Sequence, residues 1–262
     1  GIYTAEITEA SVLVWKQVGE LPSPVAYGVS ISRSGEMILV GGNNADGGLT
    51  SVFRLKLAED GEAILDTLPS LPFALDNMSG AASGNTIYVA GGNRNGSPST
   101  SMLSLNLDEP ELGWKEEVPF PGAARVQPVC AVQDGMLYLW GGFCPLQNGG
   151  EASVATDGYR YLPLQERWEP VPAPAVAETG ESLTLTGGTS CVWSDSIILC
   201  TGGVDKDIFL DAISGDYKRI AKEDYLLQPV AWYRFNGRLM AYNTRRNHWE
   251  QWEESACLAR AG

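Results

Sequence analysis

The sequence predicts an all-β propeller, because one short motif recurs along the chain. Four apolar segments end in a glycine pair: MILVGGNN, TIYVAGGNRN, MLYLWGGFCP and IILCTGGVDK. The pairs begin at residues 41, 91, 141 and 202, so successive intervals are 50, 50 and 61 residues. A period near 50 is typical of repeat folds in which each unit is one four-stranded blade. Repeated blades bury one another's faces and limit exposed sheet edges.

Each repeat can be divided into four strands. The first strands are YGVSIS, MSGAAS, QPVCAV and GTSCVW, and the turns RSGE, GN, DG and SD lead into the strands that end at the glycine pairs. These turn residues accept the backbone angles of tight hairpins. The third strands, VFRLKL, MLSLNL, YRYLPL and RLMAYN, alternate as half-buried strands do. The pattern is that of a kelch-type β-propeller.

Aromatic residues mark the outer strands. Trp114, Trp168 and Trp249 fall in the expected fourth strands, and Tyr161 and Tyr242 precede the last two tryptophans by seven residues. Because large rings fill the wedge between neighbouring blades, we expect these side chains to pack in the core rather than to stack on a ligand.

The phase of the repeat predicts a single propeller domain over residues 1–262 that lacks part of each end. Residues 1–19 match the outer half of a blade, residues 20–70, 71–120, 121–172 and 173–253 match whole blades, and residues 254–262 match the start of another. We therefore expect about four whole blades of a six-bladed ring. The long fourth repeat contains Ile208, Leu210 and Ile213 at helical spacing, which predicts a loop excursion with a short helix that Gly215 interrupts.

Composition narrows the choice of partners. The formal net charge of −14 disfavours nucleic acid, and no apolar run is long enough for a membrane span. Cys130, Cys144, Cys191, Cys200 and Cys257 lack metal-site spacing and are expected to be free thiols, a disulfide being the less favoured alternative. His248 is the single histidine, which argues against a histidine-based metal site and against a copper oxidase, and no cofactor is expected.

One stretch of the sequence resembles a known enzyme family. GELPSPVAYGVSISRSGEMILVGGNNADGG, which contains Gly-Glu-Leu-Pro, Ala-Tyr-Gly-Val-Ser and Gly-Gly, is similar to the cyclically permuted branch of the kelch-type sialic acid mutarotases, the N-acetylneuraminate epimerases. The stretches LPSLPFALDNMSGAASGNTIYVAGG and GWKEEVPFP also resemble that branch. The resemblance implies a six-bladed propeller, often a homodimer, periplasmic or secreted, that interconverts the anomers of N-acetylneuraminate without a cofactor. The segment GIYTAEITEA shows no signal peptide.

The catalytic motif that the resemblance implies does not occur in this sequence. In the family, Asn-Gly-Glu-x-x-Pro-Gly-x-Arg-Thr supplies a glutamate base and an arginine for the substrate carboxylate, whereas FNGRLMAYNTRR shares only Asn-Gly. The catalytic residues are therefore unknown, and the chain alone is expected to be inactive.

Polar residues recur in the loops expected around the channel mouth. An acidic sugar needs a cation for its carboxylate and an acid–base pair for mutarotation. The sequence predicts that exposed loop residues bind the substrate, with an arginine facing its carboxylate: Arg125, Arg94, Tyr27, Asn43, Asn93, Asn77 and Gln127, with Asp76 nearby. The alternative is a non-catalytic kelch module that binds protein or carbohydrate, because fold alone does not fix function.

Overall fold

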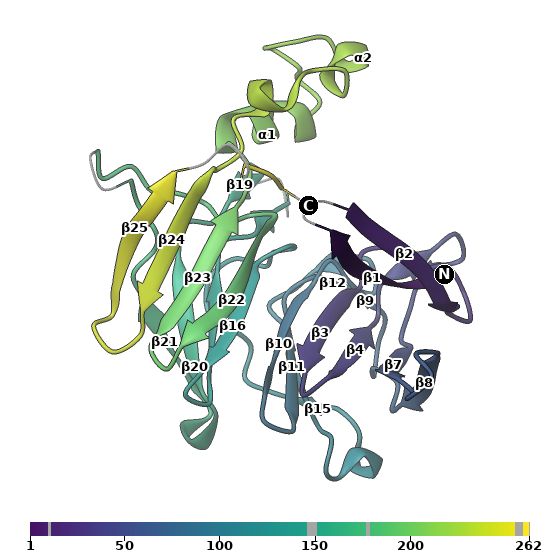
Figure 1. Cartoon of the computed structure of the whole chain (residues 1–262). Coiled ribbons are helices and arrows are strands. Elements are labelled where there is room, and N and C mark those ends of the chain that lie inside the picture. Colours follow the sequence, from purple (N-terminus) through teal and green to yellow (C-terminus); the bar gives the residue numbers. More distant parts are fainter. Residues whose placement is uncertain (10–11, 146–150, 177–178, 255–258, 262) are drawn as a thin grey trace.

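A computed structural model describes residues 1–9, 12–145, 151–176, 179–254 and 259–261, with side chains described except at 6–9, 12 and 252–254. The described residues contain four antiparallel sheets of four strands each, and every sheet is a meander in sequence order. The four blades stand side by side as an open fan, as Figure 1 shows. The predicted kelch-type propeller architecture is confirmed.

The blades follow the repeat that the sequence predicts. Their strands are β3 (Val29–Arg33), β4 (Glu36–Val40), β7 (Val52–Leu57) and β8 (Ala63–Leu68); β10 (Ser79–Ser83), β11 (Thr86–Ala90), β14 (Met102–Asn106) and β15 (Lys115–Glu116); β16 (Val129–Gln133), β17 (Met136–Trp140), β20 (Gly158–Leu162) and β21 (Arg167–Val171); and β22 (Gly188–Ser194), β23 (Ile197–Gly202), β24 (Arg238–Asn243) and β25 (His248–Glu254). Short 3-10 helices, η1 (Pro110–Leu112) and η2 (Pro163–Gln165), precede β15 and β21. The glycine pairs close the second strand of each blade, as predicted.

The core lies between the blades. Along β11, Ile87 and Val89 face the first blade, whereas Tyr88 and Ala90 face the third. Successive side chains of a strand point to opposite faces of the sheet, so this one strand contributes to two interfaces. The third interface contains Trp140, Tyr242 and Trp249 in mutual ring contact, with centroids 5.0 to 5.2 Å apart.

The tryptophans of the outer strands join neighbouring blades, as the sequence predicts. The indole Nε1 of Trp114 donates to the Pro69 carbonyl at 2.9 Å, and that of Trp168 donates to the Val118 carbonyl at 2.8 Å. Trp249 repeats the contact with Pro172 at 2.8 Å. In each case the acceptor belongs to the segment that leaves the preceding blade.

The N-terminal segment forms a separate hairpin of β1 (Ile2–Glu9) and β2 (Val12–Gly19). The two predicted strands are confirmed. Val18 is buried, whereas Trp15 is 66% exposed. That the hairpin is the outer half of a blade stays a prediction.

The long fourth repeat contains the expected helix. α1 (Lys206–Ile213) ends before Gly215, whose φ is +80°, and is followed by α2 (Lys222–Tyr225) and η3 (Val230–Tyr233). Asp205 caps α1 by accepting hydrogen bonds from two backbone N–H groups. Phe209 of α1 packs edge-on against Phe143, with ring centroids 5.2 Å apart. This contact attaches the excursion to the third blade.

Candidate functional site

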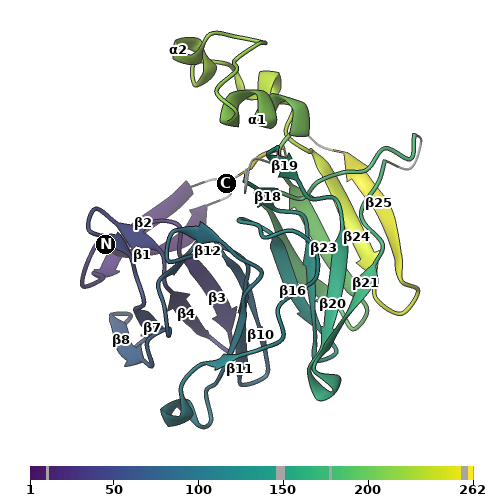
Figure 2. The same cartoon turned by 180° about the vertical axis from the view of Figure 1, so that it is seen from behind.

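One end of the fan carries the segments that follow the glycine pairs, and we call this end the rim. Three pairs are followed by small hairpins, which are β5 (Asn43–Asn44) with β6 (Gly47–Gly48), β12 (Asn93–Arg94) with β13 (Ser97–Pro98), and β18 (Phe143–Cys144) with β19 (Ser153–Val154). At the fourth pair the helical excursion takes the place of a hairpin, as Figure 2 shows. Most of the sequence-predicted site residues lie on this rim.

Glycine is required where the rim meets the next blade. Gly92 has φ +82°, and a Cβ at this position would lie 2.3 Å from the Asp76 carbonyl oxygen. Its N–H donates to the Arg125 carbonyl at 2.8 Å. A side chain here would therefore clash with the backbone of the same blade and disturb the hydrogen bond from Gly92 to the next one.

A chain of backbone hydrogen bonds runs across the starts of β3, β10 and β16, the first strands of their blades, which we call the inner strands. Tyr27, Asn77 and Gln127 all have left-handed backbone angles, with φ of 57°, 53° and 51°. The Asn77 N–H donates to the Tyr27 carbonyl and the Gln127 N–H donates to the Asn77 carbonyl, both at 2.7 Å. Gly187 continues the series with a longer 3.5 Å contact to Gln127. Three of the predicted site residues are thus structurally equivalent neighbours.

Side chains connect the same region. The Asp76 carboxylate accepts from Asn77 Nδ2 and from Asn93 Nδ2, each at 2.7 Å. Gln127 Nε2 donates to Asn77 Oδ1 at 3.2 Å. Asp76 belongs to β9 (Leu75–Asp76), which pairs with β12. The structure therefore brings Asn77, Asn93 and Gln127 together around Asp76. We call these four residues the amide cluster.

Two further predicted residues flank the first blade. Asn43 exchanges backbone hydrogen bonds with Ala26, both at 2.8 Å. The neighbouring Tyr27 is 61% exposed. The side chains of these two residues take no part in the hydrogen bonds that join Asp76, Asn77, Asn93 and Gln127.

Arg94 is engaged by protein groups. Its guanidinium lies 3.7 Å from the centroid of the Phe73 ring and forms a 3.0 Å ion pair with Glu116 of β15. The side chain is 41% exposed. A ligand carboxylate would have to compete with Glu116 for this cation.

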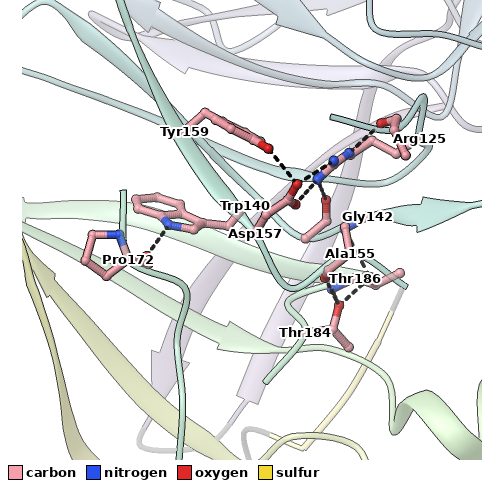
Figure 3. A network of polar contacts seen from close by, with 11 residues as sticks. Arg125, Trp140, Gly142, Ala155, Asp157, Tyr159, Pro172, Thr184 and Thr186 are labelled. Carbon is pink, nitrogen blue, oxygen red and sulfur yellow. Dashed lines mark hydrogen bonds and ion pairs between the residues drawn. The ribbon is translucent and has the colours of Figure 1, made fainter. Parts of the chain in front are cut away.

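Arg125 is buried, so the expectation of an exposed loop arginine is wrong for this residue. It is 1% exposed and forms a two-pronged ion pair with Asp157, in which Nη1 contacts Oδ1 and Nη2 lies 3.0 Å from Oδ2 (Figure 3). Nε donates to the Ala123 carbonyl at 2.9 Å, and Nη1 donates to the Gly141 carbonyl at 3.1 Å. All of these hydrogen-bond partners of the guanidinium belong to the third repeat, so Arg125 links segments within one blade.

The charge of Arg125 sets the ionisation of Asp157. Burial alone would raise the pKa of the Asp157 carboxyl, but the hydrogen bonds and positive charge of Arg125 outweigh it and hold that pKa below its ordinary value. Tyr159 also donates to Asp157, at 2.9 Å. Burial, followed by this bond to Asp157, raises the pKa of Tyr159. Sequence reasoning missed Asp157 because the equivalent positions of the first two blades, whose carbonyls accept from Gly41 and Gly91, carry serines rather than carboxylates: Ser51 and Ser101.

Two threonines replace the usual backbone contact at the fourth blade. Gly142 N–H donates to Thr186 Oγ1 at 3.0 Å, and Thr184 Oγ1 donates to the Ala155 carbonyl at 2.9 Å (Figure 3). Both threonines are buried. These hydroxyls join blades three and four. Between blades two and three the equivalent contact is the hydrogen bond from the Gly92 N–H to the Arg125 carbonyl.

Arg260 is a second residue that sequence reasoning missed. Its carbonyl accepts from Gly203 N–H at 2.8 Å, as the carbonyls of Leu75 and Arg125 accept from Gly42 and Gly92. Its side chain is exposed, unlike that of Arg125. The equivalence is visible only in the backbone hydrogen bonds.

Other predicted features can be located as well. Cys130, Cys144 and Cys200 are buried free thiols and Cys191 is an exposed one, whereas Cys257 lies outside the described residues. Burial raises the pKa of Cys130 to about 12. Within the described residues there is no grouping of three His, Cys, Asp or Glu side chains suited to a metal, and no helix long and apolar enough to cross a membrane.

Comparison with known proteins relates this architecture to one family. The model of the N-acetylneuraminate epimerase family matches residues 68–262. N-acetylneuraminate epimerase from Salmonella arizonae is 32% identical over 204 residues, which cover 75% of this chain and 50% of the relative. The protein of the same name from Haemophilus influenzae is 30% identical over 203 residues, covering 75% and 51%.

A solved structure supports the fold. The structure titled "Structure of YjhT" superposes with a TM-score of 0.60 at 23% identity, and the match covers 74% of this chain and 56% of that one. The chain spans about half the length of the curated relatives it matches. On the family match, the chain belongs to the N-acetylneuraminate epimerase family.

Proposed function

We propose that this chain acts in the interconversion of the α and β anomers of N-acetylneuraminate, with the rim as the sugar-binding face of a single propeller domain. The family match over residues 68–262 carries this proposal. The amide cluster supports it, because amide and carboxylate groups on a shared rim suit the hydroxyl and acetamido groups of a sugar.

The reaction requires a base at the anomeric hydroxyl and an acid at the ring oxygen. The glutamate–arginine motif of the family is not among these 262 residues. The role proposed for the described residues is therefore binding and orientation of the sugar. Tyr27, Asn77, Asn93 and Gln127 supply the polar contacts, and Asn43 lies on the neighbouring hairpin.

The substrate carboxylate needs a cation that can be reached from solvent. Arg125 is excluded from direct contact unless it leaves Asp157, because its side chain is 1% exposed. Arg94 and the exposed Arg260 are better placed to meet a solvated anion. A two-pronged guanidinium–carboxylate contact gives both affinity and a fixed orientation.

The test separates binding from catalysis. Ligand-detected NMR measures whether the chain binds N-acetylneuraminate, and the same spectra follow relaxation from an α-enriched sample prepared with a sialidase. Binding with anomer exchange above the uncatalysed rate supports the full proposal. Binding at the uncatalysed rate is the result expected of this chain, which lacks the glutamate–arginine motif, and it supports the proposed role in binding and orientation; the alternative of a carbohydrate-binding module would give the same result. Absence of binding refutes both.

A further inference from the structure

A carboxylate that is almost fully buried organises the amide cluster. Asp76 is 7% exposed, and its Oδ1 accepts two short hydrogen bonds, from side chains on either side of it. Among the described residues no Lys, Arg or His forms a salt bridge with it. An ionised carboxylate placed here without a cation is costly unless hydrogen-bond donors surround it.

The charge of Asp76 fixes which way the amides point. An ionised carboxylate accepts hydrogen bonds only, so the NH₂ groups of Asn77 and Asn93 must face it. The carbonyl oxygen Oδ1 of Asn77 then faces away from Asp76 and accepts from Gln127 Nε2 at 3.2 Å. Gln127 is in turn oriented with Nε2 toward Asn77, so its Oε1 points away from that contact. One carboxylate thereby sets the orientation of three amides.

The oriented amides favour one part of a sugar over another. Amide carbonyl oxygens that are turned away from Asp76 can accept from sugar hydroxyls and from an acetamido N–H, whereas a carboxylate has no proton to donate. The negative charge of Asp76 behind them further disfavours an anion at close range. An acidic sugar would therefore bind here through its neutral groups, with its own carboxylate directed elsewhere.

We propose that Asp76 is a positioning residue that orients Asn77, Asn93 and Gln127 to hold the hydroxyl and acetamido groups of the sugar and keeps the sugar carboxylate away from the amide cluster. This inference rests on the function proposed above. It adds which part of the sugar faces these amides and which residue dictates that choice.

The test compares two sugars and three variants of the 262-residue chain. N-acetylneuraminate is the acidic probe and N-acetylmannosamine is a neutral acetamido probe. Asp76→Asn keeps the size of the side chain but replaces an acceptor-only carboxylate with an amide that can also donate. Gln127→Ala removes the half-buried last amide of the cluster without disturbing Asp76. Asp66→Asn, on the outer strand β8, is the control for loss of one negative charge. Saturation-transfer NMR reports both affinity and which sugar protons touch the protein.

In the wild type, the acetyl methyl and glycerol-chain protons of N-acetylneuraminate should receive more saturation than the H3 protons beside its carboxylate. Asp76→Asn and Gln127→Ala should each weaken the binding of both sugars by roughly tenfold, the usual effect of losing one charged or buried hydrogen bond. Asp76→Asn should also reduce the bias toward the acetyl methyl, which partial unfolding would not do.

Three results would overturn the inference. The first is unchanged affinity and an unchanged saturation pattern in both variants while the wild type binds, which leaves the proposed function standing. The second is a pattern dominated by the H3 protons in the wild type. The third is no binding of either sugar by the wild type, which removes the proposed function as well.

Discussion

Removing Asp157 should destabilise the protein more than removing Arg125. The ion pair is asymmetric, because the Arg125 side chain is 1% exposed whereas the Asp157 side chain is 39% exposed. Asp157→Ala would leave a buried guanidinium without a counter-ion, in contact with the carbonyls of Ala123 and Gly141 and with the ring of Phe120. Arg125→Met would leave a carboxylate that water can reach, and would preserve much of the side-chain volume.

The magnitudes follow from this difference in burial. Breaking a fully buried pair costs about 3–5 kcal/mol. Since one partner here is partly hydrated, we place Asp157→Ala near the lower end, at about 3 kcal/mol, and Arg125→Met at about 1–2 kcal/mol. The double variant should cost less than the sum of the two, because it leaves neither charge unpaired.

Urea unfolding followed by tryptophan fluorescence measures these free energies. Lys218→Met, which removes an exposed ion pair with Asp216, is the control and should lie within about 0.5 kcal/mol of wild type. A loss below about 1 kcal/mol for Asp157→Ala, or a larger loss for Arg125→Met, would contradict the argument that a buried guanidinium depends on its counter-ion.

Three further predictions concern pH, blade contacts and glycine. The pKa of Asp157 in the folded protein lies below its unfolded value of about 3.9. The stabilisation from the ionised carboxylate is therefore present above that pH and is lost as the pH falls through the folded pKa. Asp157→Asn should weaken the decline of the urea midpoint from pH 6 to pH 3, and an unchanged decline would argue against a lowered pKa of Asp157. Trp168→Phe, which removes the indole N–H but keeps a ring, should lower the free energy of unfolding by about 1 kcal/mol or somewhat more, measured beside Trp15→Phe at an exposed site. Gly92→Ala should prevent soluble folding, whereas Gly96→Ala, at a similar φ of +83° but with open space around it, should cost only about 1 kcal/mol. Equal expression and stability of the two variants would show that the backbone from Asp76 to Met78 can move to make room for a Cβ at Gly92.

The repetitive part of the fold could be predicted from the sequence. Apolar alternation, hairpin turns and paired glycines are local signals, and each reports the backbone state of the residues that carry it. The same holds for Trp114, Trp168 and Trp249, because large rings in the outer strands fill the wedge between neighbouring blades. The short helix α1 was indicated by its apolar spacing.

The environment of the arginines could not be predicted in the same way. Arg125 and Asp157 are 32 positions apart, and their approach depends on how the β18–β19 hairpin returns to the third blade. The contact of Arg94 with Phe73 and Glu116 likewise joins three separate segments. Side-chain pairing across loops depends on tertiary geometry. The sequence alone therefore does not distinguish a loop arginine that binds a ligand from one that forms an ion pair within the protein.

The backbone link from Tyr27 to Asn77 to Gln127 has a consequence for where this protein can change length. Each inner strand starts from a hydrogen bond to the one before it, so an insertion next to Asn77 would displace every later blade. The loops after the glycine pairs lie outside that link, and the fourth repeat already holds α1, α2 and η3 there while β23 and β24, the strands on either side of them, pair without a register shift. Engineered insertions, such as a reporter peptide or a second binding loop, should therefore be accommodated at Asn95–Gly96 and not at the start of an inner strand.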